Sequence, residues 1–382
     1  MRVLIFSNAY RPTVSGVVTS IALFRQGLIE AGHGVHIIAP EYADYEDEEP
    51  YVFRFPALDL PEALDLDLSL AIPLKTTIAP TVRGIKPALI HSQHPVVMGG
   101  LAATFARDFR LPLVFTFHSR YELYAQRYMP IMPKLAGLVT DELVKHYLEK
   151  CTYIIAPTPS IRDFILQEYE TATPVEIVPT PVDLSQYHDL EPQRVRAALG
   201  LEKAELLLYV GRLAGEKNLN FLLRAFIRVA SQRPQARLLI VGQGPIRHNL
   251  ERMALKLGLG KQVIFAGAVP HSEVPHYAAA ADVFVFSSLV DTQGLVLIEA
   301  MAAGTPVVAV EAPGPTDILR TGGGILAPAQ EDAFAESVLK LLADRPGRRA
   351  LGEQAAQAAQ RYTVPAATAR LVSVYEAALA AR

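Results

Sequence analysis

Short apolar runs alternate with amphipathic stretches along both halves of the chain. In the first half, this pattern predicts a strand at residues 3–7, a helix at about 17–31 and a second strand at 35–39. The order restarts at residues 205–210, an apolar run that is followed by a glycine turn and an amphipathic helix at 219–231. Alternating strands and helices favour parallel sheets, which bind ligands at the carboxyl ends of their strands. We therefore expect two similar α/β halves.

The length of the chain fits this division. A chain of 382 residues exceeds one ordinary domain, and two prolines within residues 179–183 stiffen a segment that suits a linker. We expect an N-terminal domain at residues 1–180 and a C-terminal domain at 181–365. A final helix within residues 366–382 is expected to pack back on the first domain. Two such domains that face each other would form a cleft.

Composition narrows the class of protein. Hydrophobic residues make up 51% of the chain, yet no apolar run approaches the roughly 20 residues of a transmembrane segment. The first apolar run follows Met1 and Arg2 directly and is too short for a signal peptide, so we expect a cytoplasmic protein. A net charge of -3 gives no overall basic field to favour nucleic acid. The single cysteine, Cys151, excludes an internal disulfide and suits core packing.

Two carboxylates near the C-terminus, Asp291 and Glu299, give the clearest indication of function. Between them the sequence predicts a strand end, a turn at Gly294 and the start of a helix. A fully helical interval would separate the acids by about 12 Å, more than the roughly 5 to 9.5 Å of a glycosidase pair. Acids this far apart, flanking the amides of a helix start, suit one elongated ligand with hydroxyls at both ends and negative charge between. A nucleotide sugar has this form.

Two cations follow the first strand of the second half. Arg212 and Lys217 lie on a polar turn after residues 205–210, where a parallel sheet would present phosphate ligands. A guanidinium grips an oxyanion with two hydrogen bonds, and an ammonium adds a point charge. Two surface cations on a turn would give the same pattern. With the acidic motif in the same domain, we favour phosphate binding.

Other nucleotide and metal motifs are incomplete or missing. The sequence Gly-Gln-Gly-Pro at residues 242–245 lacks the third glycine of a dinucleotide-binding fingerprint, which argues against hydride transfer. Neither a Walker-type loop nor a zincin motif is present. ATP hydrolysis and metalloprotease chemistry are therefore not supported.

Histidines end two apolar runs of the first half. His118 lies at the carboxyl end of a strand, where its polar neighbours favour a ligand contact over a purely structural role. His91 and His94 end another strand, but no third ligand of suitable spacing accompanies them, so packing or cleft lining is favoured over a metal site. The acidic run from Glu41 to Glu49 is more typical of a solvated loop, and we assign it no chemistry.

These residues together resemble the retaining glycosyltransferases of family four. The resemblance implies the GT-B fold, with two Rossmann-like α/β domains facing across a cleft and parallel sheets flanked by helices. Residues 116–124 and 291–299 look most like the bacterial branch that glycosylates diacylglycerol. The matching segments are Ser15-Gly16, residues 90–95, His118, Gly211-Arg212 with Lys217, and residues 281–285, 294–299 and 304–308.

The resemblance assigns roles to the charged residues of the second half. Arg212 and Lys217 would hold the donor diphosphate, and Glu299 would bind the ribose diol. Asp291 would contact the hexose hydroxyls. The family more often has glutamate at this last position, and aspartate keeps the charge but shortens the reach by one methylene. The choice of donor sugar could therefore differ from that of close relatives.

Backbone groups and first-domain residues would complete the donor site. The resemblance implies that amides at Gly294 and Leu295 support the sugar and phosphate, and that Gly242 and Val269 line the nucleobase pocket. His118 would touch the sugar near the reacting carbon.

The resemblance also implies that the loop at Ser15 and Gly16 covers the diphosphate. The family more often has two glycines here, so the serine adds a hydroxyl and restricts the backbone.

The expected reaction needs neither a metal nor a cofactor. A departing nucleoside diphosphate develops negative charge, which Arg212, Lys217 and a helix N-terminus would oppose. No Asp-x-Asp element stands where a divalent ion would be bound. The resemblance further implies retention of the anomeric configuration, with the acceptor proton passing to the leaving phosphate.

The acceptor is expected to contact an aromatic and apolar stretch after His118. From the residues alone, a buried helix and loop is slightly favoured there, and only the resemblance favours a lipid. We expect a peripheral enzyme at the inner face of the cell membrane that moves glucose from UDP-glucose to diacylglycerol. A glycosyltransferase with a soluble sugar or small-metabolite acceptor is the alternative, followed by a non-catalytic nucleotide-sugar binding protein. The candidate acceptor residues are Tyr121, Tyr124, Tyr128 and Met129.

Overall fold

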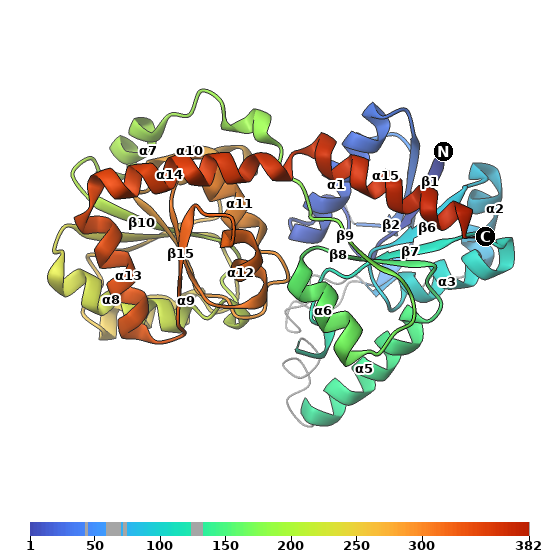
Figure 1. The fold of residues 1–382 in the computed structure, drawn as a ribbon, viewed down its shortest axis with the longest axis horizontal. Coiled ribbons are helices and arrows are strands. Elements are labelled where there is room, and N and C mark those ends of the chain that lie inside the picture. Colours follow the sequence, from blue (N-terminus) through green and yellow to red (C-terminus); the bar gives the residue numbers. More distant parts are fainter. Residues whose placement is uncertain (43–44, 59–69, 72–74, 124–132, 382) are drawn as a thin grey trace. The chain divides into compact units, whose positions relative to one another are not determined.

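The chain forms two compact units, Met1–Pro181 with Val364–Arg382, and Val182–Thr363 (Figure 1). Each unit contains one large parallel sheet with helices on both faces, which confirms the predicted class of two Rossmann-like α/β domains. The computed structural model describes residues 1–42, 45–58, 70–71, 75–123 and 133–381.

The large sheet of the first unit has seven strands among the described residues, in the order β3-β2-β1-β6-β7-β8-β9. All neighbouring strands are parallel, and their near-continuous apolar runs suit a sheet that is covered on both faces. A separate antiparallel pair is formed by β4 (Ala57–Leu58) and β5 (Leu70–Ala71). The strands of the large sheet are β1 (Arg2–Phe6), β2 (Gly34–Pro40), β3 (Val52–Phe55), β6 (Leu89–Ser92), β7 (Leu113–Thr116), β8 (Tyr153–Ala156) and β9 (Val175–Ile177).

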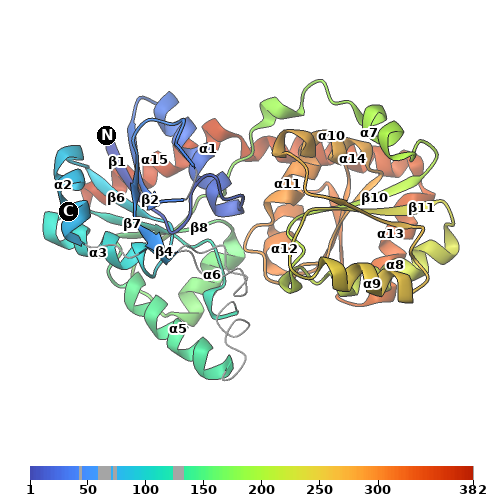
Figure 2. The same ribbon diagram turned by 180° about the vertical axis from the view of Figure 1, so that it is seen from behind.

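Helices from the two ends of the chain cover one face of this sheet. α1 (Gly16–Glu30) packs beside α15 (Val364–Ala380), and the two helices share an apolar core with the sheet (Figure 2). His91 of β6 hydrogen-bonds Tyr375 of α15 at 2.7 Å and Thr116 of β7 at 2.8 Å, which ties the final helix to the sheet. The opposite face packs against α2 (Lys75–Ile85), α3 (Met98–Phe109), α5 (Pro133–Leu148) and α6 (Pro159–Glu168).

The sheet of the second unit has six strands among the described residues, in the order β12-β11-β10-β13-β14-β15. All neighbouring strands are again parallel. β10 covers the six residues that the sequence predicts. The strands are β10 (Glu205–Val210), β11 (Ala236–Val241), β12 (Val263–Gly267), β13 (Val283–Phe286), β14 (Val307–Val310) and β15 (Gly324–Ala327).

Two apolar cores attach the helices of the second unit to the faces of its sheet. One face packs against α8 (Leu219–Gln232), α9 (Arg247–Lys256) and α13 (Glu331–Ala343). The other packs against α7 (Pro192–Leu199), α10 (Val274–Ala280), α11 (Leu295–Ala302), α12 (Pro313–Leu319) and α14 (Arg345–Ala359). The 3-10 helices of this unit are η2 (Leu184–Tyr187), η3 (Gly215–Lys217), η4 (His271–Glu273) and η5 (Gln360–Tyr362).

Among the described strands, the order of each large sheet reverses at one place. In the second unit the chain passes from β10 to β11 and β12 on one side, then returns to pair β13 with the other edge of β10. In the first unit the reversal lies between β1 and β6. Open α/β sheets bind ligands beyond the carboxyl ends of the strands at such a point. A ligand site is therefore expected at the loops after β10 and β13 in the second unit, and at those after β1 and β6 in the first.

No helix in the described part of the chain combines the length and the apolar character that crossing a bilayer requires.

Candidate functional site

Lys217 and Asp291 meet where the strand order of the second sheet reverses. Lys217 ends η3 after β10, and Asp291 lies on the loop after β13. The Lys217 Nζ atom lies 2.7 Å from Asp291 Oδ1 and 3.0 Å from Oδ2, and both side chains are 20% exposed. Ser287 Oγ donates to the carbonyl oxygen of Lys217 at 2.8 Å, which fastens the two loops together. The sequence predicts both charged residues at the donor site but gives no indication of their contact.

This ion pair links two groups with different predicted ligands. A phosphate oxygen that approaches Lys217 competes with the Asp291 carboxylate for the ammonium protons. A ligand hydroxyl that donates to Asp291 can replace a hydrogen bond that the carboxylate otherwise accepts from Lys217. Removing one member of a shielded ion pair leaves the other charge uncompensated. A ligand that carries both a phosphate and hydroxyls would satisfy both members at once.

The turn after β10 lies against the turn after β11. Gly242 has a φ of 138°, and a Cβ atom there would lie 2.0 Å from the carbonyl oxygen of Gly211, so a larger residue would not fit. The carbonyl oxygen of Arg212 accepts a hydrogen bond from Tyr209 Oη at 3.1 Å. Gly242 and Arg212 thus occupy adjacent turns at the carboxyl edge of the sheet. Their contacts with nucleobase and diphosphate stay predictions.

Glu299 lies on the second turn of α11, where its side chain is buried. Its Oε1 atom lies 3.2 Å from Nε2 of His271, in η4 just beyond β12. The hydrogen bond from His271 to this carboxylate raises the pKa of the imidazole, against burial, which lowers it. Sequence reasoning missed His271. The signal that could have found it is a polar residue in the segment that follows the carboxyl end of a strand, four residues past Gly267.

The helix that carries Glu299 begins at a glycine in the left-handed region. Gly294 has a φ of 78°, and Leu295 is the first helical residue, as the sequence predicts. The Leu297 amide donates to the carbonyl oxygen of Gly294 at 2.9 Å. The amides that precede it have no acceptor within the helix, so they can bind an anion or a hydroxyl near Asp291. Leu295 and Val269, the predicted nucleobase contact, pack against the same apolar core.

In the first unit, Ser15 has a structural role. Its backbone is extended, with a φ of -154°, and its Oγ atom accepts a hydrogen bond from the Val18 amide at 3.3 Å. Ser15 is therefore the N-cap of α1, which Gly16 begins. The hydroxyl that stands where the family more often has glycine thus fixes the start of the helix.

The acidic loop between β2 and β3 fastens the segment that leads to Ser15. Glu49 is 19% exposed at its side chain and accepts a hydrogen bond from Tyr10 Oη at 2.6 Å. It also pairs with Arg11 at 2.6 Å, and Tyr10 and Arg11 both lie between β1 and α1. The expectation of a purely solvated acidic loop is therefore wrong at Glu49, because the charge pattern along the chain does not reveal partners from another loop.

His118 lies just beyond β7 and is half-buried. Its Nε2 atom lies 2.7 Å from Oε1 of Gln93, and because a carbonyl oxygen only accepts, His118 is the donor. Burial lowers the pKa of His118 well below its usual value, and the nearby His94 and His91 lower it further. The imidazole is therefore neutral at neutral pH. Its contact with the sugar stays a prediction.

His91 and His94 have structural partners. Both ring nitrogens of His91 are used by the hydroxyls of Tyr375 and Thr116, and burial lowers its pKa to about 3. The Nδ1 atom of His94 accepts a hydrogen bond from the Asn8 amide at 3.1 Å, and burial lowers the pKa of His94 to about 4. These contacts support packing as their role. Within the described residues, no group of three or more His, Cys, Asp and Glu is placed to hold a metal ion.

Of the candidate acceptor residues, only Tyr121 lies in the described part of the chain. It is half-buried, and its ring packs edge-on against Phe117 with 5.4 Å between centroids. This contact makes Tyr121 part of the apolar core of the first unit. Tyr124, Tyr128 and Met129 lie outside the described residues.

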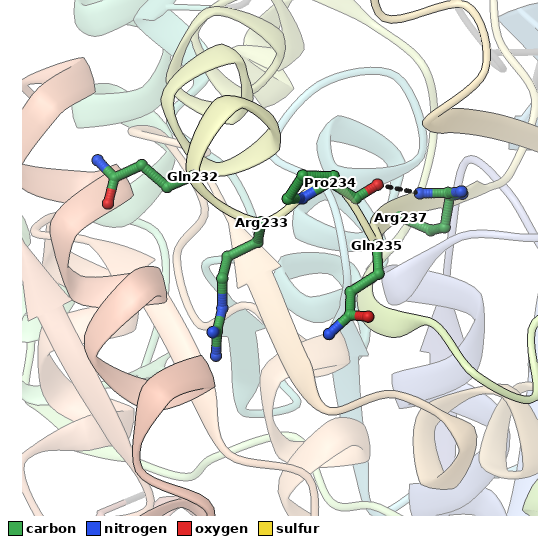
Figure 3. Close-up of a pocket in the computed structure, with 5 residues that line it drawn as sticks. All are labelled: Gln232, Arg233, Pro234, Gln235 and Arg237. Carbon is green, nitrogen blue, oxygen red and sulfur yellow. Dashed lines mark hydrogen bonds between the residues drawn. The ribbon is translucent and has the colours of Figure 1, made fainter.

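An open depression lies at the opposite, amino-terminal edge of the second sheet (Figure 3). Its two guanidinium groups already have protein partners. Arg237 donates to the carbonyl oxygen of Pro234 at 2.9 Å, and Arg233 pairs with Glu205 at 3.0 Å. The depression is far along the strands from the reversal point and contributes nothing to the site. It is lined by Gln232, Arg233, Pro234, Gln235 and Arg237.

Comparison with protein families and relatives agrees with the geometry of both units. The model described as Glycosyltransferase Family 4 matches residues 14–186, and the model described as Glycosyl transferases group 1 matches residues 193–358. The alpha-monoglucosyldiacylglycerol synthase of Acholeplasma laidlawii is 30% identical over 319 residues, which cover 81% of this chain and 80% of that protein. The protein of the same name from Streptococcus pneumoniae is 31% identical over 321 residues, 81% of this chain and 71% of that one.

Among solved structures, a sucrose-phosphate synthase from Thermosynechococcus elongatus has a similar fold. Its TM-score is 0.83 with 23% sequence identity, and the match covers 100% of both chains. At this identity, the likeness shows a shared fold and no more.

Proposed function

Because this chain belongs to glycosyltransferase family 4 and is a hexosyltransferase of the GT-B type, we propose that it moves glucose from UDP-glucose to a hydroxyl of diacylglycerol. The observation that carries the choice of substrates is the identity of 30% and 31% with two proteins named alpha-monoglucosyldiacylglycerol synthase, each over 81% of the chain. The site in the second unit supports the donor part of the proposal.

In the proposed complex, the donor lies along the carboxyl edge of the second sheet. Lys217 and Arg212 bind the diphosphate, and Asp291 accepts from the hexose hydroxyls. Glu299 accepts from the ribose diol. The remaining donor contacts are the amides of Gly294 and Leu295, the nucleobase pocket at Gly242 and Val269, and Ser15, Gly16 and His118 from the first unit.

The proposed reaction breaks the bond between the anomeric carbon and the diphosphate and forms a bond from that carbon to the acceptor oxygen. Lys217 and Arg212 offset the charge that develops on the leaving diphosphate, in place of a divalent ion. The acceptor hydroxyl attacks from the face that the diphosphate leaves, so the configuration is retained. Its proton passes to the leaving phosphate, and His118, a neutral imidazole, contacts the sugar near the reacting carbon.

Helix α5 supports the proposal of a peripheral membrane enzyme, which we place at the inner face of the cell membrane. Leu138, Val139 and Leu143 are 65%, 51% and 53% exposed and lie on one side of this helix. Large apolar side chains that stay exposed together suit contact with a lipid surface.

The test is a panel of nucleotide sugars offered to the purified protein with vesicles that contain diacylglycerol, followed by mass spectrometry of the lipids. We expect hexosyl-diacylglycerol from UDP-glucose, with the α configuration by NMR and an unchanged rate in EDTA. Product from a soluble sugar without vesicles would replace the lipid acceptor with a soluble one. Binding of UDP without turnover on any acceptor would show a nucleotide-sugar binding protein instead. Loss of activity in EDTA, restored by a divalent ion, would overturn metal independence.

A further inference from the structure

One short segment of the second unit joins two parts of the donor site. The chain leaves β12 at Gly267 and passes Val269 before it enters η4 at His271. Val269 packs on the apolar core beside the proposed nucleobase pocket, and His271 reaches the carboxylate of Glu299 on α11. The segment therefore connects the nucleobase side of the site with the acid proposed to bind the ribose.

The two partners differ sharply in exposure. The side chain of His271 is 49% exposed, whereas that of Glu299 is 8% exposed. The imidazole thus lies between a buried carboxylate and solvent. Its Nε2–H group donates to Oε1 of Glu299 and orients the carboxylate, whose second oxygen, Oε2, is a further acceptor that a hydroxyl of a ligand can use.

The charges around His271 come mainly from this carboxylate. Within its own helix, Glu273 is engaged by Arg194 of α7 at 2.8 Å. His276 of α10 accepts a hydrogen bond from the Glu191 amide at 3.0 Å. On η2, Tyr187 is affected by Glu299, since burial and then this charge raise its pKa. Among the described residues, Glu299 is thus the charged group that bears on the protonation of His271.

We propose that His271 is a positioning residue for the nucleotide sugar, which holds Glu299 for the ribose hydroxyls and makes nucleotide binding tighter as the pH falls. This inference rests on the proposed role of Glu299 in the donor site. His271 acts through Glu299 and takes no part in the transfer itself.

The sign of the pH dependence follows from two effects of the ligand. A bound nucleoside covers Glu299 further, and a carboxylate removed from water is stabilised by a cation beside it. A bound diphosphate also adds negative charge, which favours the protonated imidazole. Both effects raise the pKa of His271 above its value in the free protein. In the free protein, the hydrogen bond with Glu299 already raises this pKa above the usual value of a histidine. Binding therefore takes up a proton, and affinity increases as the pH falls through this pKa.

The experiment measures the affinity for uridine and for UDP by calorimetry between pH 5.5 and 8.5. Uridine is the decisive ligand because the terminal phosphate of UDP itself titrates at about pH 6. The variants are H271A, which removes the hydrogen bond, and H271Q, whose amide can still donate to Glu299 but does not titrate. H248Q is the matched control, since His248 is 91% exposed on α9 and is assigned no role in the site.

We expect wild-type protein and H248Q to bind uridine more tightly at low pH, by up to about tenfold where binding shifts the pKa by one unit. H271Q should bind within about threefold of wild type at high pH and show no pH dependence, whereas H271A should be about tenfold weaker. Melting temperatures measured at each pH confirm that the variants are folded.

Other results would overturn the inference. A wild-type affinity that is independent of pH, or an H271Q profile that follows wild type, removes His271 from this role. An E299A variant separates the role of His271 from the proposed ribose contact of Glu299. If E299A weakens uridine binding while the His271 variants do not, only the inference fails. If E299A binds uridine as tightly as wild type, the proposed ribose contact fails, and the role of His271 fails with it.

Discussion

At the scale of single residues, the contact between Lys217 and Asp291 determines what the site offers a ligand. Asparagine at position 291 keeps the size of the side chain but removes the charge that holds the ammonium. We expect D291N to bind UDP about three to ten times more tightly, because the diphosphate no longer competes with a carboxylate for Lys217. Glucose transfer should fall about a hundredfold, because the hexose loses a charged acceptor. Calorimetry with UDP and product formation measure the two effects.

The matched control for this prediction is D291E, which restores the charge and the residue that the family more often has. Its affinity for UDP should stay close to that of wild type. Weaker binding of UDP to D291N would contradict competition and show that the carboxylate orients Lys217 for the phosphate.

How far the sequence predicts the site depends on the distance between contacting residues along the chain. Arg212 and Gly294 follow strands directly, so the apolar pattern and the glycine turns place them at the carboxyl edge. The contact of Lys217 with Asp291 joins loops 74 residues apart and depends on the pairing of β10 with β13, which the pattern does not specify. The contact of His271 with Glu299 likewise depends on how η4 packs against α11.

At the scale of elements, the acidic loop is expected to support the start of α1. E49Q removes the charge that Tyr10 and Arg11 contact, and we expect it to lower the free energy of unfolding by about 2 kcal/mol. The melting temperature should fall by several degrees. If the loop at Ser15 covers the diphosphate as proposed, the KM for the donor should also rise. E48Q, an equally acidic but exposed neighbour, is the control and should leave both quantities unchanged. Equal effects of the two variants would argue against a fastening role.

Helix α5 gives a second prediction at this scale. L138E places a charge at an apolar position that is 65% exposed, so folding should be unaffected while contact with lipid is weakened. We expect the fraction of protein that sediments with vesicles to fall severalfold, along with activity on vesicle-bound diacylglycerol. L255E is the control, because Leu255 is 69% exposed on α9 of the other unit. Equal losses in the two variants would indicate a general effect of charge, and no loss in L138E would remove α5 from the membrane contact.

At the scale of the whole molecule, the apolar pattern was sufficient for the fold class because it repeats. Each half begins with a buried strand, a turn and an amphipathic helix, and strands that are covered on both faces read as continuous apolar runs. The hydrogen bond between His91 and Tyr375 of α15 shows what the pattern does not reveal. Tyr375 and His91 are 284 residues apart, and neither residue type signals a buried pair by itself.

This buried histidine also makes the first unit sensitive to acid. Burial holds the pKa of His91 at about 3, whereas in the unfolded chain it returns to about 6.5. Between these values the unfolded chain binds a proton that the folded unit does not, so the free energy of unfolding falls as the pH drops, by about 1.4 kcal/mol per pH unit. His94, with a pKa of about 4, adds a loss of the same sign. His271 acts in the opposite direction, since its raised pKa gives a stabilisation that is present below about pH 6.5 and is lost as the pH rises through the folded value.

H91Q tests the contribution of His91, because an amide can hydrogen-bond Tyr375 and Thr116 but does not titrate. Hydrogen exchange of the β6 and β7 amides reports the stability of the first unit. The exchange rates of variant and wild type are compared at the same pH, so the intrinsic exchange rate cancels from their ratio. Between pH 6.5 and 4.5, we expect protection in wild type to fall about tenfold per pH unit relative to H91Q. H248Q should follow wild type, since its imidazole is 91% exposed. If protection in H91Q and wild type falls in parallel, the proton that unfolding takes up is not bound at His91.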